Sequence, residues 1–125
     1  GAHNTDGIQA FLQTVGQDGC VGKRFLLFSM VREKQYRAVM DMLAASELFD
    51  EIGVAAIQDK RALPLRELAD FFRQYTGLRI REFDRLEDAV RDFTARRGAA
   101  DRVYIVGSLY LAGEVKALLR RPSHD

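Results

Sequence analysis

The residues best suited to chemistry follow an apolar run in the last quarter of the chain. Residues 103–106 are Val-Tyr-Ile-Val, and Gly107 and Ser108 come directly after them. An uninterrupted apolar run is typical of a parallel strand that is covered on both faces. Gly107 lets the backbone turn and approach a ligand, and Ser108 can cap a following helix whose first N–H groups attract a carboxylate or a phosphate. The pattern predicts an anion-binding corner, although most such corners in α/β domains bind nothing.

Three further side chains stand beside predicted strands or helices and could take part in the same chemistry. Arg61 follows the apolar run 52–57, and a guanidinium group can bind a carboxylate through two parallel hydrogen bonds. Lys34 follows the run 24–30, and His3 precedes the first predicted helix. Each has a plainer interpretation as well, because surface arginines, solvated lysines at helix ends and exposed turn histidines are common.

Apolar residues recur with two different periods and predict alternating helices and strands. Strands are predicted at 24–30, 52–57, 78–83 and 103–106, and helices at 6–17, 33–46, 64–75, 84–97 and 109–120. We expect the two most apolar strands, 24–30 and 103–106, to lie side by side. The run 78–83 alternates apolar and charged residues, which places it near an edge of the sheet.

This order of elements predicts an α/β fold, with an open, mainly parallel, Rossmann-like sheet and helices on both of its faces. Asp84 and Glu87 have the spacing of a capping box at the start of the fourth helix. Such a sheet normally begins with a strand, whereas this chain begins with residues 1–4, which look like a turn, and a helix. We therefore expect an N-terminal strand to be missing from this fragment.

Ligands of such sheets bind outside the carboxyl ends of the strands. The residues that the predicted elements bring to that edge are His3, Asn4, 29–34, 58–61, Asp84 and 107–110.

Composition limits the classes of function that the chain can serve. Its 125 residues, 47% of them hydrophobic, predict a single domain with one core. The 19 basic and 18 acidic side chains nearly cancel, which argues against binding to nucleic acid or to an anionic membrane. One cysteine, Cys20, and the lack of a long apolar run predict no disulfide framework, no membrane span and a cytoplasmic location. The two histidines stand near opposite ends, without the clustering that a zinc site needs.

The familiar nucleotide-binding motifs are absent from these 125 residues. The sequence contains neither G-x-G-x-x-G nor G-x-x-x-x-G-K-[ST], so it does not support dinucleotide or triphosphate binding by this domain alone. A Ser-His-acid triad has no signal beyond the presence of the residue types.

Four segments, in the right order, resemble one enzyme family. Residues 1–8 are similar to the Asp-Gly-Ala-His-Asn-Pro segment of folylpolyglutamate synthase/dihydrofolate synthase, a member of the Mur ligase superfamily. Residues 26–35 resemble its apolar strand and Asp-Lys-Asp turn, and residues 60–62 its Arg-Ala signature. Residues 106–115 resemble its Gly-Ser-Leu-Tyr-Leu segment, which is the most specific match. Together the segments cover nearly the whole chain, which therefore resembles the C-terminal domain of that ligase.

The chain departs from the family pattern at several positions. The leading Asp of the first segment is not present, and Thr5 stands where the family usually has Pro. Glu33 and Gln35 replace the two Asp residues of the Asp-Lys-Asp turn. Thr5 can still cap a helix, whereas the loss of the acid at position 35 changes the surroundings of Lys34.

The resemblance implies an ATP-dependent acid–amino-acid ligase. In this family ATP phosphorylates the carboxyl group of a dihydropteroate or folate, and the amine of L-glutamate attacks the resulting acyl phosphate. Transferred to this sequence, His3 and Asn4 would face the nucleotide, and Lys34 would be a catalytic residue near the phosphate or the acyl intermediate. Arg61, Ser108 and Tyr110 would hold the glutamate.

The resemblance also implies how the work is divided between domains. ATP and Mg²⁺ would be bound mainly by an N-terminal ATPase domain of the same chain, so the isolated domain is expected to be inactive. The partners are then small molecules, namely L-glutamate, ATP, and folate or dihydropteroate, with no nucleic acid and no membrane, and the protein is expected to be monomeric. A stand-alone α/β regulatory or ligand-binding module, such as a receiver-like domain, is the alternative, because it has a similar size and alternation of elements.

Overall fold

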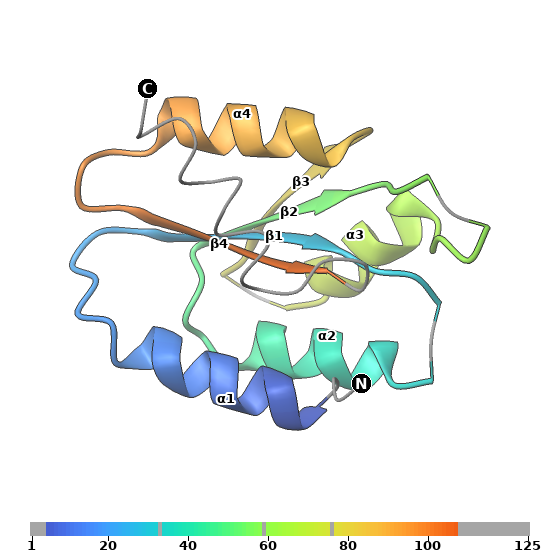
Figure 1. The fold of residues 1–125 in the computed structure, drawn as a ribbon, viewed down its shortest axis with the longest axis horizontal. Coiled ribbons are helices and arrows are strands. Elements are labelled where there is room, and N and C mark those ends of the chain that lie inside the picture. The colour runs from blue at the N-terminus through green and yellow to red at the C-terminus, as the bar shows by residue number, and fades with distance from the viewer. Residues whose placement is uncertain (1–4, 33, 59, 76, 108–125) are drawn as a thin grey trace.

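The core of the molecule is a parallel sheet of four strands. The computed structural model describes residues 5–32, 34–58, 60–75 and 77–107. Its strands are β1 (Arg24–Ser29), β2 (Glu51–Ala55), β3 (Arg79–Phe83) and β4 (Arg102–Gly107), and its helices are α1 (Thr5–Gly16), α2 (Tyr36–Ala45), α3 (Leu65–Arg73) and α4 (Leu86–Arg96). The strands lie in the order β3-β2-β1-β4, and every neighbouring pair is parallel (Figure 1).

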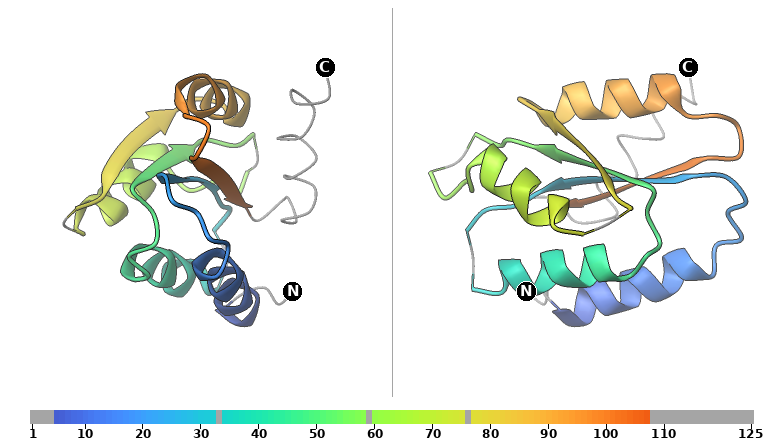
Figure 2. Two further views of the ribbon diagram at one scale, coloured as in Figure 1. Left: turned by 90° about the vertical axis from the view of Figure 1, so that its left-hand side faces the viewer. Right: turned by 180° about the vertical axis from the view of Figure 1, so that it is seen from behind.

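The side of the sheet on which each new strand is added changes between β3 and β4. Strands β1 to β3 are laid down outward in sequence order, and the chain then crosses back to place β4 on the other side of β1. Because crossovers between parallel strands are right-handed, this reversal moves the connecting helix to the opposite face. Helix α4 accordingly covers one face and α1, α2 and α3 cover the other (Figure 2). The predicted α/β, Rossmann-like fold is confirmed, as are the pairing of β1 with β4 and the edge position of β3.

Alternating side chains of the strands supply two apolar cores. Leu26 and Phe28 of β1 belong to the core under α1–α3, whereas Phe25 and Leu27 belong to the core under α4. The uninterrupted apolar sequence of β1 is thereby explained, since both of its faces are buried. Gly53 is required in β2, because a Cβ there would lie 2.9 Å from the Phe93 ring of α4.

The structure corrects the predicted start of α4. Arg85, not Asp84, is the residue before the first helical turn, and it makes no side-chain capping hydrogen bond. The predicted capping box is therefore wrong. The spacing of two acids cannot reveal the backbone angles at residue 85, which are extended.

Two other element ends differ from the prediction. Strand β2 ends at Ala55, whose partner Phe83 is the last residue of β3, and the Ala56 N–H donates to the Phe83 carbonyl at 3.1 Å. Helix α2 begins at Tyr36, since Lys34 and Gln35 form a turn and the first helical bond runs from Val39 N–H to the Gln35 carbonyl. The predicted helix 109–120 lies outside the described residues. Among the helices that are described, none is long and apolar enough to cross a membrane.

Candidate functional site

The carboxyl edge of the sheet collects the residues after each strand. All four strands run in the same direction, so Ser29, Ala55, Phe83 and Gly107 end at one edge. Ser29 and Gly107 are paired in register at the point where the strand order reverses. In open α/β sheets this switch point is the usual place for a ligand. The Gly107 corner predicted from the sequence therefore lies at the expected edge.

A short backbone bridge joins the loops that follow β1 and β2. Val31 and Ala62 form an isolated antiparallel bridge, and the Arg32 N–H donates to the Arg61 carbonyl at 2.6 Å. Lys34 and Arg61, two of the predicted site residues, are therefore carried by loops that are tied together at the carboxyl edge. Both side chains are exposed, as ligand-binding groups at the mouth of a site need to be.

The other predicted site residues lie outside the part of the chain that the structure describes. These residues are His3, Asn4, Ser108 and Tyr110. Gly107, the neighbour of Ser108, lies at the same sheet edge as the loop that carries Arg61. The expected approach of Arg61 and Ser108 to a common anion stays a prediction.

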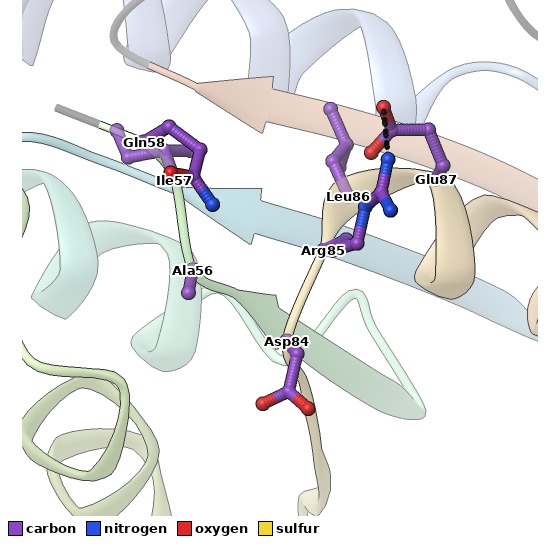
Figure 3. Close-up of a pocket in the computed structure, with 7 residues that line it drawn as sticks. All are labelled: Ala56, Ile57, Gln58, Asp84, Arg85, Leu86 and Glu87. Atoms are coloured by element: carbon purple, nitrogen blue, oxygen red, sulfur yellow. Dashed lines mark ion pairs between the residues drawn. The ribbon is translucent and has the colours of Figure 1, made fainter.

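An open pocket of about 470 Å³ lies at the same edge, between the ends of β2 and β3. It is lined by Ala56, Ile57, Gln58, Asp84, Arg85, Leu86 and Glu87 (Figure 3). Arg85 Nη2 lies 3.7 Å from Glu87 Oε2, while the Asp84 carboxylate points away from both of them (Figure 3). Gln58 and Asp84 were predicted at this edge, whereas Arg85 and Glu87 were not, although they closely follow the predicted strand 78–83.

A cluster of two arginines and a tyrosine stands at the start of α2. The guanidinium carbons of Arg32 and Arg37 lie 5.9 and 5.6 Å from the centre of the Tyr36 ring. Arg37 Nε donates to the Tyr36 hydroxyl at 3.0 Å, and this hydrogen bond raises the pKa of Arg37 and so favours its charged form. The Tyr36 hydroxyl in turn lies 3.5 Å from Glu67 Oε2. Neither Tyr36 nor Arg37 is among the site residues predicted from the sequence.

The amino edge of the sheet has a buried ionic cluster around Glu51. Glu51 is 4% exposed, and its Oε2 lies 2.6 Å from Arg96 Nη2 and 3.1 Å from Arg81 Nε. Arg96 also pairs with Asp92 at 2.8 Å. These pairs link β2, β3 and α4, so the cluster holds the helix on the sheet.

Two further carboxylates at the amino edge bind groups of the chain itself. Asp18 pairs with Arg24 at 2.8 Å, and this hydrogen bond lowers the pKa of Asp18. Asp101 accepts backbone hydrogen bonds from Lys23 at 2.8 Å and from Gly98 at 2.7 Å, which lower the pKa of Asp101. The contacts of both carboxylates therefore hold parts of the fold together. In the described ranges no group of three or more His, Cys, Asp or Glu side chains is arranged to hold a metal ion.

The sequence matches the model of one known protein family. The model of the family described as "Mur ligase, glutamate ligase domain" matches residues 1–109. The chain belongs to this family. No curated protein matches the sequence.

Several solved structures have the same fold over nearly the whole of this chain. E. coli FolC in complex with ADP has a TM-score of 0.79 and 17% sequence identity, over 99% of this chain. The bifunctional folylpolyglutamate synthase/dihydrofolate synthase of Yersinia pestis, with AMPPNP and a Mn ion, has a TM-score of 0.76 and 24% identity, over 95% of this chain. Folylpolyglutamate synthase of Mycobacterium tuberculosis with ADP has a TM-score of 0.64 and 25% identity, over 96% of this chain.

The match covers only a part of each of these relatives. The chain spans 28% of the E. coli protein, 27% of the Y. pestis protein and 29% of the M. tuberculosis protein.

Proposed function

We propose that this glutamate ligase domain is the C-terminal domain of a larger ligase that joins L-glutamate to folate or dihydropteroate with the use of ATP. The observation that carries the proposal is the bridged pair of loops at the carboxyl edge, which bears Lys34 and Arg61 in a domain of this family. The names of the similar structures, which are folylpolyglutamate synthases, support the choice of substrate. The family match also favours this function over a receiver-like module.

The reaction has two steps in this proposal. A carboxylate oxygen of the acceptor attacks the γ-phosphorus of ATP, the bond to the bridging oxygen breaks, and ADP leaves. The neutral amine of L-glutamate then attacks the acyl carbon of the acyl phosphate, inorganic phosphate leaves, and the nitrogen loses a proton. The product is an amide, and one ATP is consumed for each glutamate added.

Each site residue has a distinct task in this scheme. Lys34 stabilises the negative charge that develops on the transferred phosphoryl group. Arg61 binds a carboxylate of the incoming glutamate through its guanidinium group, with Ser108 and Tyr110 as further contacts. These contacts orient the amine toward the acyl carbon, and such positioning accounts for much of the catalysis in two-substrate reactions.

We assign the nucleotide and its metal mainly to an N-terminal domain of the parent chain. His3 and Asn4 would complete the nucleotide site from the glutamate ligase domain. Support comes from the similar structures, which hold ADP, or AMPPNP with a Mn ion, and are more than three times as long as the part matched here. Closure of the two domains would exclude the water that hydrolyses an acyl phosphate.

A ligation assay with the full-length parent protein tests this proposal. The enzyme is incubated with ATP, Mg²⁺, L-glutamate and either dihydropteroate or a reduced folate. We expect a product heavier by one glutamyl unit and one ADP for each unit added. Product formed without ATP, or with L-alanine as readily as with L-glutamate, would contradict the assignment.

A further inference from the structure

The start of α2 gathers more positive charge than its neighbours balance. Arg32 and Arg37 approach one aromatic ring, that of Tyr36, although like charges repel. Among the residues that the structure describes, Glu67 provides a carboxylate beside them. Its Oε1 lies 4.0 Å from Arg32 Nη2, at the limit of an ion pair. Lys34 is exposed in the same loop and makes no ion pair with any residue that the structure describes. The cluster therefore has hydrogen-bond donors that an anionic ligand can use.

The backbone bridge extends this positive surface to the next loop. The hydrogen bond from Arg32 N–H to the Arg61 carbonyl joins the loop of the arginine cluster to the loop that contains Lys60. Residues 30–37 contribute three cations and one acid, Glu33, to this surface. Cationic side chains are thus distributed along the carboxyl edge.

A groove begins at this cluster and runs between α2 and α3. Its open volume is about 510 Å³, and Tyr36 and Arg37 on α2 face Arg66 on α3 across it. Met40 and Phe71 add apolar surface. Two acids also line the groove: the Tyr36 hydroxyl lies 3.5 Å from Glu67, and Asp70 pairs with Arg73 at 3.3 Å. Arg66 pairs with Glu82 at 3.3 Å, although its side chain is 74% exposed.

We propose that Arg32, Arg37 and the adjoining groove bind the glutamyl tail of an acceptor that already carries several γ-linked glutamates. The inference rests on the proposed function, which supplies such an acceptor. A γ-linked glutamyl chain repeats one carboxylate after each pair of methylene groups, so it suits a groove whose lining includes both guanidinium groups and apolar side chains. Guanidinium groups bind each carboxylate through charge-assisted hydrogen bonds, and the methylene groups cover the apolar wall.

A single phosphate group fits this surface less well. Phosphates are usually bound where several donors converge on one point, as at a helix N-terminus or in a nest of backbone N–H groups. The cationic groups here are instead spread along the groove, from Arg32 and Arg37 beside Tyr36 to Arg66 on another helix. Several carboxylates on one flexible chain can contact more than one of them.

Binding to the 125-residue chain tests the inference directly. Chemical shifts of the isotope-labelled chain are followed by NMR during titration with γ-linked tetraglutamate, with free L-glutamate and with tripolyphosphate. We expect tetraglutamate to bind most tightly and to shift signals of residues 32–40 and 66–71. The double variant Arg32→Gln/Arg37→Gln should weaken tetraglutamate binding on the order of 10- to 100-fold, as expected for lost hydrogen bonds to charged groups. Arg91→Gln is the matched control, because Arg91 is 78% exposed on the helix that covers the other face.

Kinetics of the full-length ligase separate this inference from the proposed function. The double variant should raise the KM for a tetraglutamyl acceptor by a similar factor and leave the KM for a monoglutamyl acceptor and for ATP within about twofold. A ligase that adds no glutamate to any acceptor overturns the proposed function. An active ligase overturns only the tail site if both acceptor KM values rise equally, if tripolyphosphate binds the chain as tightly as tetraglutamate, or if tetraglutamate binds no better than glutamate.

Discussion

The two edges of the sheet use their charged side chains in different ways. At the amino edge, buried Glu51 lies 2.6 Å from Arg96, and Asp18 lies 2.8 Å from Arg24. At the carboxyl edge, the corresponding distances are 4.0 Å between Arg32 and Glu67 and 3.7 Å between Arg85 and Glu87, with all four side chains largely exposed. The least exposed acids of the first edge form short ion pairs within the chain, whereas the exposed arginines of the second lie farther from their acids.

This difference separates residues that hold elements of the fold together from residues to which we assign a binding role. The ion pairs of the amino edge join elements that are distant in sequence, such as β2 and α4. Loops at the carboxyl edge are tied together by their backbone, through Val31 and Ala62, which leaves the side chains of Lys34 and Arg61 outside the bridge itself. Substitutions at the amino edge should therefore change stability, and substitutions at the carboxyl edge should change binding.

The largest loss of activity is expected when the 125-residue chain is tested without the rest of the proposed ligase. The 125-residue chain alone should neither hydrolyse ATP nor ligate glutamate, because the proposed site needs a second domain to bind the triphosphate and exclude water. Incubation with ATP, Mg²⁺, a reduced folate and glutamate checks this. Turnover above that of the Arg61→Ala chain would show that the chemistry does not need the second domain.

Arg61→Ala in the full-length ligase tests the binding role of the carboxyl edge. The KM for glutamate should rise on the order of 10- to 100-fold, and more than the KM for ATP, because one charge-assisted contact is lost. Arg79→Ala is the matched control, since Arg79 is an exposed arginine at the start of β3, on the amino edge. An equal rise in both KM values for Arg61→Ala would contradict the glutamate assignment.

Glu51→Gln tests the structural role of the amino edge. Loss of the Glu51 charge leaves Arg96 and Arg81 with Asp92 as their remaining acid, so the free energy of unfolding should fall by about 1–3 kcal/mol. Chemical denaturation measures this change, and the glutamate KM should stay unchanged. Glu87→Gln, at the exposed carboxyl edge, should alter stability by less than about 0.5 kcal/mol. Equal losses of unfolding free energy for Glu51→Gln and Glu87→Gln would contradict a stabilising role that is confined to the amino edge.

The smallest effect concerns the pH dependence that Asp101 contributes at the amino edge. Its backbone hydrogen bonds lower its pKa below the ordinary value of 3.8. A carboxyl group with a lowered pKa in the folded state stabilises the fold at pH values above 3.8 and loses that contribution as the pH falls through its folded pKa. The difference in Tm between the wild type and Asp101→Asn should therefore be larger at pH 7 than at pH 3. A Tm difference that is the same at pH 7 and pH 3 would contradict the lowered pKa of Asp101.

Much of the fold could be predicted from the sequence because its signals are local. The apolar runs around Leu26 and Ile105 predict strands that are buried on both faces, and the alternation around Ile80 predicts an edge strand. The capping-box prediction at Asp84 failed because it depends on the backbone angles of Arg85, which the residue types do not specify. Of the candidate site, the placement of Lys34 and Arg61 at one sheet edge followed from the order of strands and helices.

The amino-acid sequence alone determined which segments are strands or helices, which family the chain resembles, and which loops follow the strands. Only the tertiary structure decided that Arg32 N–H would bond to the Arg61 carbonyl, that two arginines would meet at Tyr36, and that Glu51 would be buried with its partners. Periodicity reports which face of an element is apolar, because that pattern repeats within a few residues. Contacts between loops depend on the register and packing of strands that are distant in sequence, and no local pattern records them.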